Sequence, residues 1–146
     1  MEKDILITFK GLNRYIDGES DSAEFKTRGT LYKKNDKYYI KYTEVLGDCN
    51  DSYDITMKLE TGKATIMRFG EFSTQLTLEM GRKHVNYYET PHGSLVVGVI
   101  AESISIDVGG PEGNIKLYYD VEINNAPSSK NSIVMSYKEI GGNSNE

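Results

Sequence analysis

The sequence has no tryptophan, a single cysteine, three prolines and no excess of basic residues. Cys49 on its own cannot form an internal disulfide, so an oxidising compartment is not indicated and we expect a cytoplasmic protein. The net charge of −5 argues against a general nucleic-acid-binding protein, which needs a basic face. The longest apolar run, LVVGVIA, falls far short of the roughly 20 residues of a membrane helix, and the opening MEKDILITFKG does not resemble a signal peptide.

Alternation of apolar and polar residues dominates the chain. In NIKLYYDVEIN, which begins at Asn114, every second residue is apolar or aromatic. The face predicted to point inward consists of Ile115, Leu117, Tyr119, Val121 and Ile123. This period of two indicates a strand with one face on a core and one in water.

Short turn sequences separate these alternating segments, among them KKNDK, ETGK, EMGRK, TPHG and GGPEGN. Nine or ten strands joined by such turns predict an antiparallel meander, and closing it into a barrel removes both open edges. We therefore expect an all-β fold: a single antiparallel up-and-down β-barrel of about eight to ten strands over residues 1–140. A two-sheet sandwich is the alternative. Residues 141–146, GGNSNE, are expected to be a disordered tail.

The stretch YYETPHGSL predicts a rigid corner between two strands. Pro91 has a fixed φ and pushes Thr90 toward an extended conformation, while Gly93 permits the reversal of the chain. His92 is expected to be exposed on this corner.

Four stretches carry a resemblance to a known family: TRGTLYKKNDKYYIKYTE, IMRFGEFSTQLTLEMGRK, YYETPHGSL and GNIKLYYDVEIN. In this order, and over nearly the whole chain, they resemble the YwiB-like family of small bacterial proteins, a domain of unknown function. The resemblance implies a calycin (lipocalin-like) β-barrel with an internal cavity or a plugged core. It implies no ligand and no active-site residues, because the family has no established biochemical role.

Several motifs are explained better by structure than by chemistry. His84 and His92 are the only histidines, too few for a typical zinc site, so no metal and no cofactor are predicted. Cys49 lies between aspartates, which disfavour its thiolate. The GGPEGN segment precedes a strand rather than a helix, and this predicts a hairpin loop rather than a phosphate site.

The inner face of the early strand is the most informative. Tyr38, Ile40, Tyr42 and Glu44 share one face, which would place a carboxylate near one barrel end, where it needs a partner. Arg68 is the candidate partner. A two-residue turn in RFGEF would turn Arg68 to solvent, whereas a longer loop would put it on the inner face with Ile66 and Thr74.

These residues suggest three functions. The first is a non-catalytic binding module for a small apolar or aromatic ligand in the barrel lumen, with Tyr38, Tyr42, Glu44, Arg68 and Tyr119 as the candidate site. The second is an enzyme acting on a phenolic or carboxylic acid, with Arg68 binding the acid, Glu44 as general acid or base, and Tyr38 or Tyr42 orienting the substrate. Phenolic acid decarboxylases are similar in fold type only. The third is a structural or interaction protein with a filled core, as a monomer or a homodimer, in which Arg68 and Glu44 form a structural latch.

Overall fold

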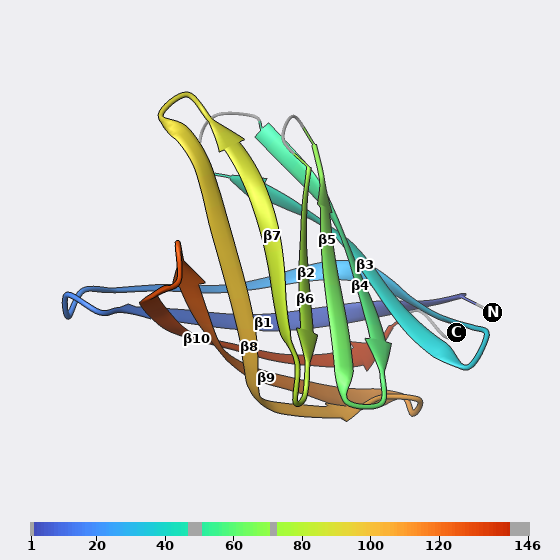
Figure 1. Ribbon diagram of the computed structural model, residues 1–146. Helices are drawn as coiled ribbons and strands as arrows, with labels where there is room; N and C mark the ends of the chain where they lie inside the picture. Colours follow the sequence, from blue (N-terminus) through green and yellow to red (C-terminus); the bar gives the residue numbers. More distant parts are fainter. Residues whose placement is uncertain (1, 47–50, 71–72, 141–146) are drawn as a thin grey trace.

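Figure 1 shows the computed structural model of the chain, in which residues 2–46, 51–70 and 73–140 are described. The strands are β1 (Glu2–Tyr15), β2 (Ser20–Lys34), β3 (Lys37–Leu46), β4 (Asp51–Glu60), β5 (Lys63–Phe69), β6 (Thr74–Glu79), β7 (Lys83–Thr90), β8 (Gly93–Asp107), β9 (Glu112–Ile123) and β10 (Ala126–Glu139). Across these ranges, no helix has the length and apolar character needed to cross a membrane. Cys49 and the predicted disordered tail, residues 141–146, lie outside the described residues.

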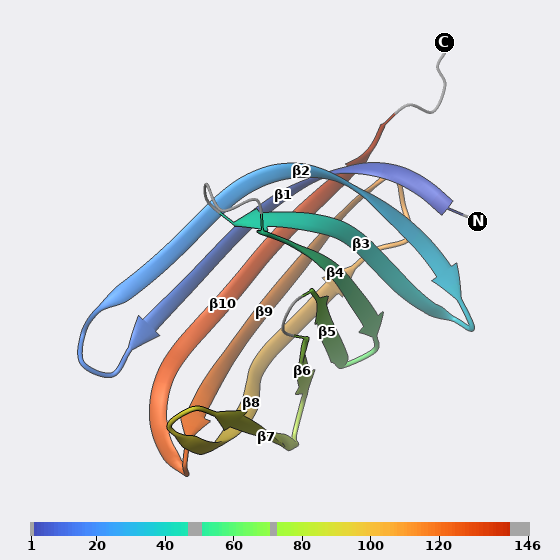
Figure 2. The same cartoon turned by 90° about the horizontal axis from the view of Figure 1, so that it is seen from above.

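All ten strands belong to one antiparallel sheet, whose order is β6-β5-β4-β3-β2-β1-β10-β9-β8-β7. The pairing of β1 with β10 joins the two ends of the chain, so the edge strands β6 and β7 come from its middle. The sheet curls until these edges contact each other, as the two views in Figures 1 and 2 show. The predicted all-β, antiparallel up-and-down barrel of eight to ten strands is confirmed, in a nearly closed form.

The seam between β6 and β7 is held mainly by side chains. Asn86 Nδ2 and the Tyr88 hydroxyl donate to the carbonyl oxygen of Gln75, at 3.4 and 3.5 Å. His84 Nε2 lies 2.9 Å from Glu79 Oε1. Within the described ranges, the only backbone pairing between the two strands is an isolated bridge at their turn. Closure therefore depends here on a few polar contacts instead of a ladder.

Turn residues with positive φ set the register of two hairpins. Asn35 and Asp36 have φ of 53° and 65°, and Asn124 and Asn125 have φ of 52° and 66°. Two consecutive residues in this region form a type I′ turn, whose twist matches that of the flanking strands.

The Pro91 corner follows its sequence prediction. Thr90 pairs with Gly93 at the junction of β7 and β8, so Pro91 and His92 form a two-residue connection. Gly93 has a φ of 115°, a conformation that side chains disfavour. His92 is exposed, as expected.

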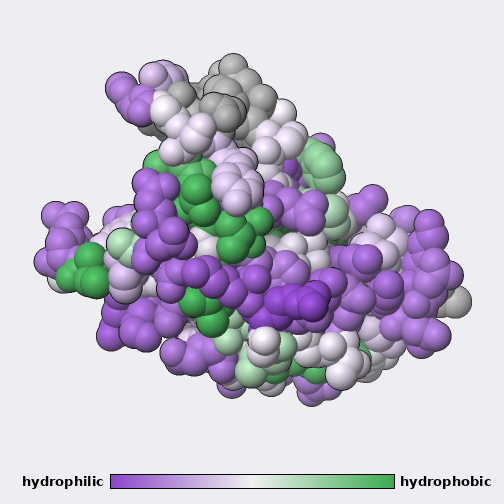
Figure 3. All heavy atoms as spheres, viewed as in Figure 1, coloured by the Kyte–Doolittle hydropathy of each residue, from purple (hydrophilic) through white to green (hydrophobic). Residues whose placement is uncertain are grey.

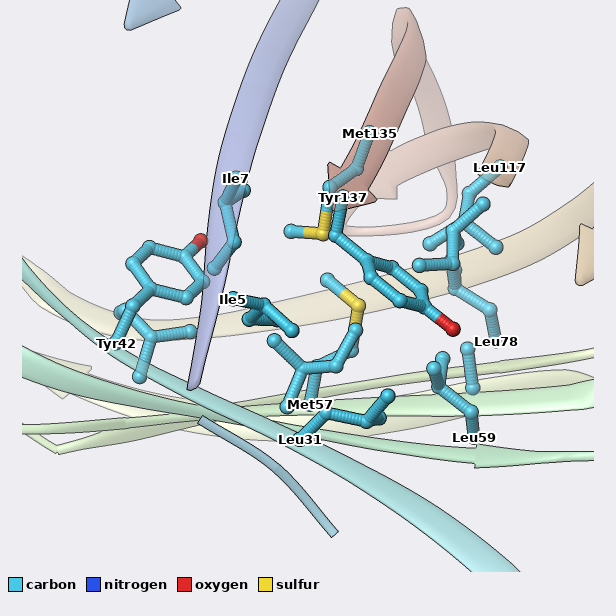
Figure 4. Close-up of a cluster of buried hydrophobic side chains, with 14 of the residues drawn as sticks. Ile5, Ile7, Leu31, Tyr42, Met57, Leu59, Leu78, Leu117, Met135 and Tyr137 are labelled. Carbon is cyan, nitrogen blue, oxygen red and sulfur yellow. The ribbon is translucent and has the colours of Figure 1, made fainter. Parts of the chain in front are cut away.

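Apolar side chains fill the middle of the barrel (Figure 4). The largest fully buried residues are Ile5, Ile7, Ile40, Met57, Leu59, Leu78, Val99, Ile115, Leu117, Met135 and Tyr137. The predicted inner face of β9 is therefore confirmed at Ile115 and Leu117, whereas Ile123, next to the turn, is exposed. Burying one such aliphatic side chain stabilises a fold by about 1.5–3 kcal/mol. Pockets lined by the described residues lie toward the two ends of the lumen, beyond this packed middle.

One end of the barrel is widened where β2 and β3 separate. Their pairing stops at Gly29 and Tyr42, although both strands continue. A Cβ atom on Gly29 would lie 2.5 Å from the Lys41 carbonyl oxygen and 2.7 Å from Ile7 Cδ1, so glycine alone permits this approach. We call the end beyond this point the Glu44 end, and the opposite one, with the turn at Asn35 and Asp36, the Tyr38 end.

The outer surface is largely hydrophilic on the face drawn in Figure 3, with hydrophobic side chains gathered over β7 and β8. Val85 and Tyr87, both on the edge strand β7, are exposed. Outside this patch, the surface in this view carries the polar half of the alternating pattern, as expected for a sheet with one face in water.

Candidate functional site

Arg68 and Glu44 meet on the inner face of the barrel. Arg68 pairs in register with Ile55 on one side and with Thr74 on the other, which is the register of the longer β5–β6 connection. Its side chain therefore points inward, and Arg68 Nη2 donates to Glu44 Oε1 at 2.8 Å. The side chains of Arg68 and Glu44 remain 40% and 22% exposed, so solvent reaches the pair.

A pocket of about 230 Å³ opens beside this ion pair at the Glu44 end. Its lining comes from seven of the ten strands: Phe9, Tyr42, Glu44, Ile55, Met57, Ile66, Arg68, Thr74, Leu76, Tyr119 and Ile133. Glu44 and Arg68 are the charged members of this wall, and the rest is apolar apart from three hydroxyl groups. A mainly apolar cavity with a few polar groups is typical of small-molecule sites.

Two tyrosine hydroxyls in the pocket wall, those of the buried Tyr42 and the half-buried Tyr119, have no hydrogen-bond partner among the described residues. Tyr42 is only 8% exposed. Burial raises the pKa of Tyr42, the nearby Glu44 carboxylate raises it further, and Arg68 opposes both effects. Burial also raises the pKa of Tyr119 to about 12. Both groups are therefore neutral phenols at physiological pH, able to donate and to accept a hydrogen bond.

Aromatic rings line one side of the site. Phe9 and Phe25 stack with their centroids 4.7 Å apart, and Phe25 contacts the ring of Tyr42 at 6.2 Å. Arg68 Cζ lies 5.2 Å from the centroid of Tyr53, within cation–π range. Figure 4 places the Tyr42 ring at the margin of the buried cluster, with its hydroxyl toward Ile7.

Phe9 and Tyr53 also belong to this site, although neither is among the residues predicted from the sequence. Tyr53 is opposite Glu44 in the β3–β4 register and lies two residues before the buried Ile55. The period of two along β4 therefore predicts that Tyr53 points to the same, inner face as Ile55. The same period of two marked Phe9, which lies two residues after the fully buried Ile7 on β1.

Tyr38 is not part of this pocket, although the sequence grouped it with the other four residues. It lies four residues before Tyr42, a span of about 13 Å along a strand, with the fully buried Ile40 between them. Tyr38 lines a separate depression of about 360 Å³ at the Tyr38 end, with Leu59, Glu60 and Ile104 among its neighbours. The structure thus brings together Tyr42, Glu44, Arg68 and Tyr119, but not Tyr38.

The depression at the Tyr38 end is larger but chemically plainer. Its acidic residues are Asp36, which is exposed, and Glu60, which pairs with Lys37 at 3.5 Å. The Glu44 end combines an inward ion pair with the Tyr42 hydroxyl, which has no partner among the residues that the structure describes, and we therefore take it as the candidate site.

Metal-binding side chains do not converge in the part of the chain that the structure describes. No group of three histidine, cysteine, aspartate or glutamate residues is placed to hold an ion there. His84 is paired with Glu79 across the seam, and this hydrogen bond lowers the pKa of Glu79.

Comparison with known proteins agrees with this architecture. The chain is 25% identical over 124 residues to the uncharacterized β-barrel protein YwiB of Bacillus subtilis (strain 168), covering 84% of each sequence. The crystal structure of the ywiB protein from Bacillus subtilis superposes with a TM-score of 0.79 at 24% identity, over 94% of this chain and 92% of that one. Residues 7–135 match the family described as Domain of unknown function (DUF1934). The chain therefore belongs to the DUF1934 family.

Proposed function

We propose that this protein is a cytoplasmic, non-catalytic binding module that holds a small apolar or aromatic molecule in the pocket at the Glu44 end. The observation that carries the proposal is the hydroxyl of the buried Tyr42, which lines the pocket and has no partner within residues 2–46, 51–70 and 73–140. A buried polar group without a hydrogen bond is costly, so such groups normally face a ligand or an ordered water.

The size of the pocket limits the ligand. A cavity of about 150 Å³ is large enough to hold benzene. The pocket of about 230 Å³ therefore suits a single ring with one or two substituents. Apolar contacts with Ile55, Ile66 and Leu76 would provide affinity, and the hydroxyls would orient the polar end of the molecule.

Binding fits the site better than catalysis does. The catalytic alternative requires Arg68 to grip the acid group of a substrate, but Glu44 already occupies one edge of the guanidinium. It also gave the orienting role to Tyr38 or Tyr42, of which Tyr42 lines this pocket and Tyr38 lines the depression at the opposite end. A purely structural role accounts for the packed middle of the barrel, but not for an open pocket whose tyrosine hydroxyls have no partner in the described ranges.

Native mass spectrometry of protein purified from its own host tests the proposal. We expect a single small-molecule adduct in stoichiometric amount. Leu76→Trp, which fills the pocket, should abolish the adduct, whereas Ile104→Trp at the Tyr38 end should retain it. An adduct that survives Leu76→Trp, or a wild-type protein that binds no small aromatic compound, would contradict a ligand at the Glu44 end.

A further inference from the structure

We infer that the ligand of this pocket carries no net charge, and that Glu44 is the residue that excludes anions. The inference rests on the proposed binding function and adds the chemical class of the ligand. It starts from the charges that face the pocket: one carboxylate and one guanidinium, joined at 2.8 Å.

Because the two charges in the pocket lining pair with each other, neither is available to bind a charged ligand. A carboxylate ligand approaching Arg68 would lie beside the Glu44 carboxylate, and an ammonium ligand approaching Glu44 would lie beside the Arg68 guanidinium. Either arrangement places like charges within a few ångströms in partly desolvated surroundings, where repulsion is stronger than in water. The ligand would also lose its own hydration without a free counter-charge.

Neutral hydrogen-bonding groups, by contrast, find several partners. The hydroxyls of Tyr42 and Tyr119 are neutral and without a partner in the described part of the chain, and Thr74 adds a third hydroxyl. Each can donate or accept, so a phenol, alcohol, ketone or amide meets complementary groups. The geometry therefore favours a neutral, monocyclic molecule with one polar end.

This mechanism of selectivity gives Glu44 a role that a merely structural ion pair lacks. Removing its charge while keeping its shape frees Arg68, and guanidinium groups bind carboxylates strongly through two parallel hydrogen bonds. The Glu44→Gln variant should then accept the anions that the wild type rejects.

Isothermal titration calorimetry with three matched compounds tests the inference: 4-methylphenol, 4-methylbenzoate and 4-methylbenzylammonium. We expect the wild type to bind 4-methylphenol at least tenfold more tightly than either ion. Glu44→Gln should tighten the binding of 4-methylbenzoate at least tenfold and change that of 4-methylphenol by less than threefold. Glu60→Gln, which makes the same change in net charge at the Tyr38 end, should leave all three affinities unchanged.

The outcomes separate the two claims. If the wild type binds 4-methylbenzoate as tightly as 4-methylphenol, the charge inference is overturned while the binding function stands. If no compound binds, the proposed function is overturned with it. If Glu44→Gln does not fold, the inference is tested with the double variant Glu44→Gln/Arg68→Met and with the order of the three affinities in the wild type. The double variant should still prefer 4-methylphenol, and a preference for the benzoate would contradict the inference.

Discussion

Arg68 of β5 and Glu44 of β3 are joined by a 2.8 Å hydrogen bond, although β4 lies between their strands in the sheet. This contact is possible because both side chains point into the barrel, where the curvature of the wall brings alternate strands together. Both side chains line the pocket at the Glu44 end and remain partly exposed to solvent.

The ion pair should contribute little to stability. Both side chains are partly exposed, so solvent screens the attraction, and we expect a coupling energy of about 0.5–1 kcal/mol. A double-mutant cycle of Glu44→Gln and Arg68→Met, measured by urea denaturation, gives this value. The exposed pair Lys10–Glu24 is the control and should show almost none. A coupling well above 2 kcal/mol would favour the structural latch over a ligand site.

Gly113 should not tolerate a side chain. A Cβ atom there would overlap the ring of Tyr137 and lie 2.6 Å from the Asp107 carbonyl oxygen. We expect Gly113→Ala to lower the free energy of unfolding by about 2 kcal/mol or more, because overpacking displaces a buried ring. Gly110→Ala, in the β8–β9 loop three residues earlier and with its nearest contact at 3.6 Å, should cost well under half of that. Equal effects would show that Tyr137 is not packed against Gly113 as described.

The hydroxyl of Tyr137 should stabilise the β8–β9 loop. It accepts from the Gly109 amide at 3.2 Å and donates to the Gly110 carbonyl at 3.1 Å. Removing it leaves both backbone groups unsatisfied, so Tyr137→Phe should cost about 1–3 kcal/mol. Tyr118→Phe, on the exposed face of β9, should be nearly neutral in the same thermal or urea unfolding experiment.

Stability should fall at alkaline pH because of Tyr119. Burial raises its pKa from the ordinary value of 10.0 to about 12, so the folded state retains this proton to higher pH than the unfolded chain does. Its contribution is complete below pH 10 and is lost between pH 10 and 12, with a total of about 2–3 kcal/mol at 1.36 kcal/mol per unit. Unfolding free energies measured across this range should decline less steeply in Tyr119→Phe. An unchanged slope would place the Tyr119 ring in water.

The seam should open more easily without its side-chain contacts. The double variant Asn86→Ala/Tyr88→Phe removes both hydrogen bonds to the Gln75 carbonyl. We expect hydrogen exchange in β6 to accelerate severalfold with little change in β1 or β10, because only the edge is released. Tyr39→Phe, on the outer wall of β3, is the control. Acceleration throughout the barrel would mean that the seam opens only with global unfolding.

Local patterns were sufficient for much of this fold. Alternation identified the strands, the Asn35–Asp36 and Pro91 turns marked reversals, and the apolar face of β3 placed Tyr42 and Glu44 inside. These features depend on a few neighbouring residues, so they can be predicted from the local sequence.

The remaining features depend on distant contacts. Whether the Arg68 side chain points inward or outward depends on a shift of one residue in the β5–β6 pairing. The pairing of β5 with β4 and β6 determines that register, and local sequence does not. Tyr38 faces inward as expected, but its distance from Tyr42 became relevant only because Ile40 and the surrounding core divide the lumen. The open seam could not be foreseen either, because it depends on the curvature of the whole sheet.

The most direct test of the account is to map where a small neutral aromatic molecule binds. Titration of ¹⁵N-labelled protein with 4-methylphenol should shift the amide signals of residues around Tyr42, Arg68, Leu76 and Tyr119, and those shifts should disappear in Leu76→Trp. Shifts centred on Tyr38 and Ile104 at the opposite end, or none at saturating ligand, would contradict a binding site at the Glu44 end.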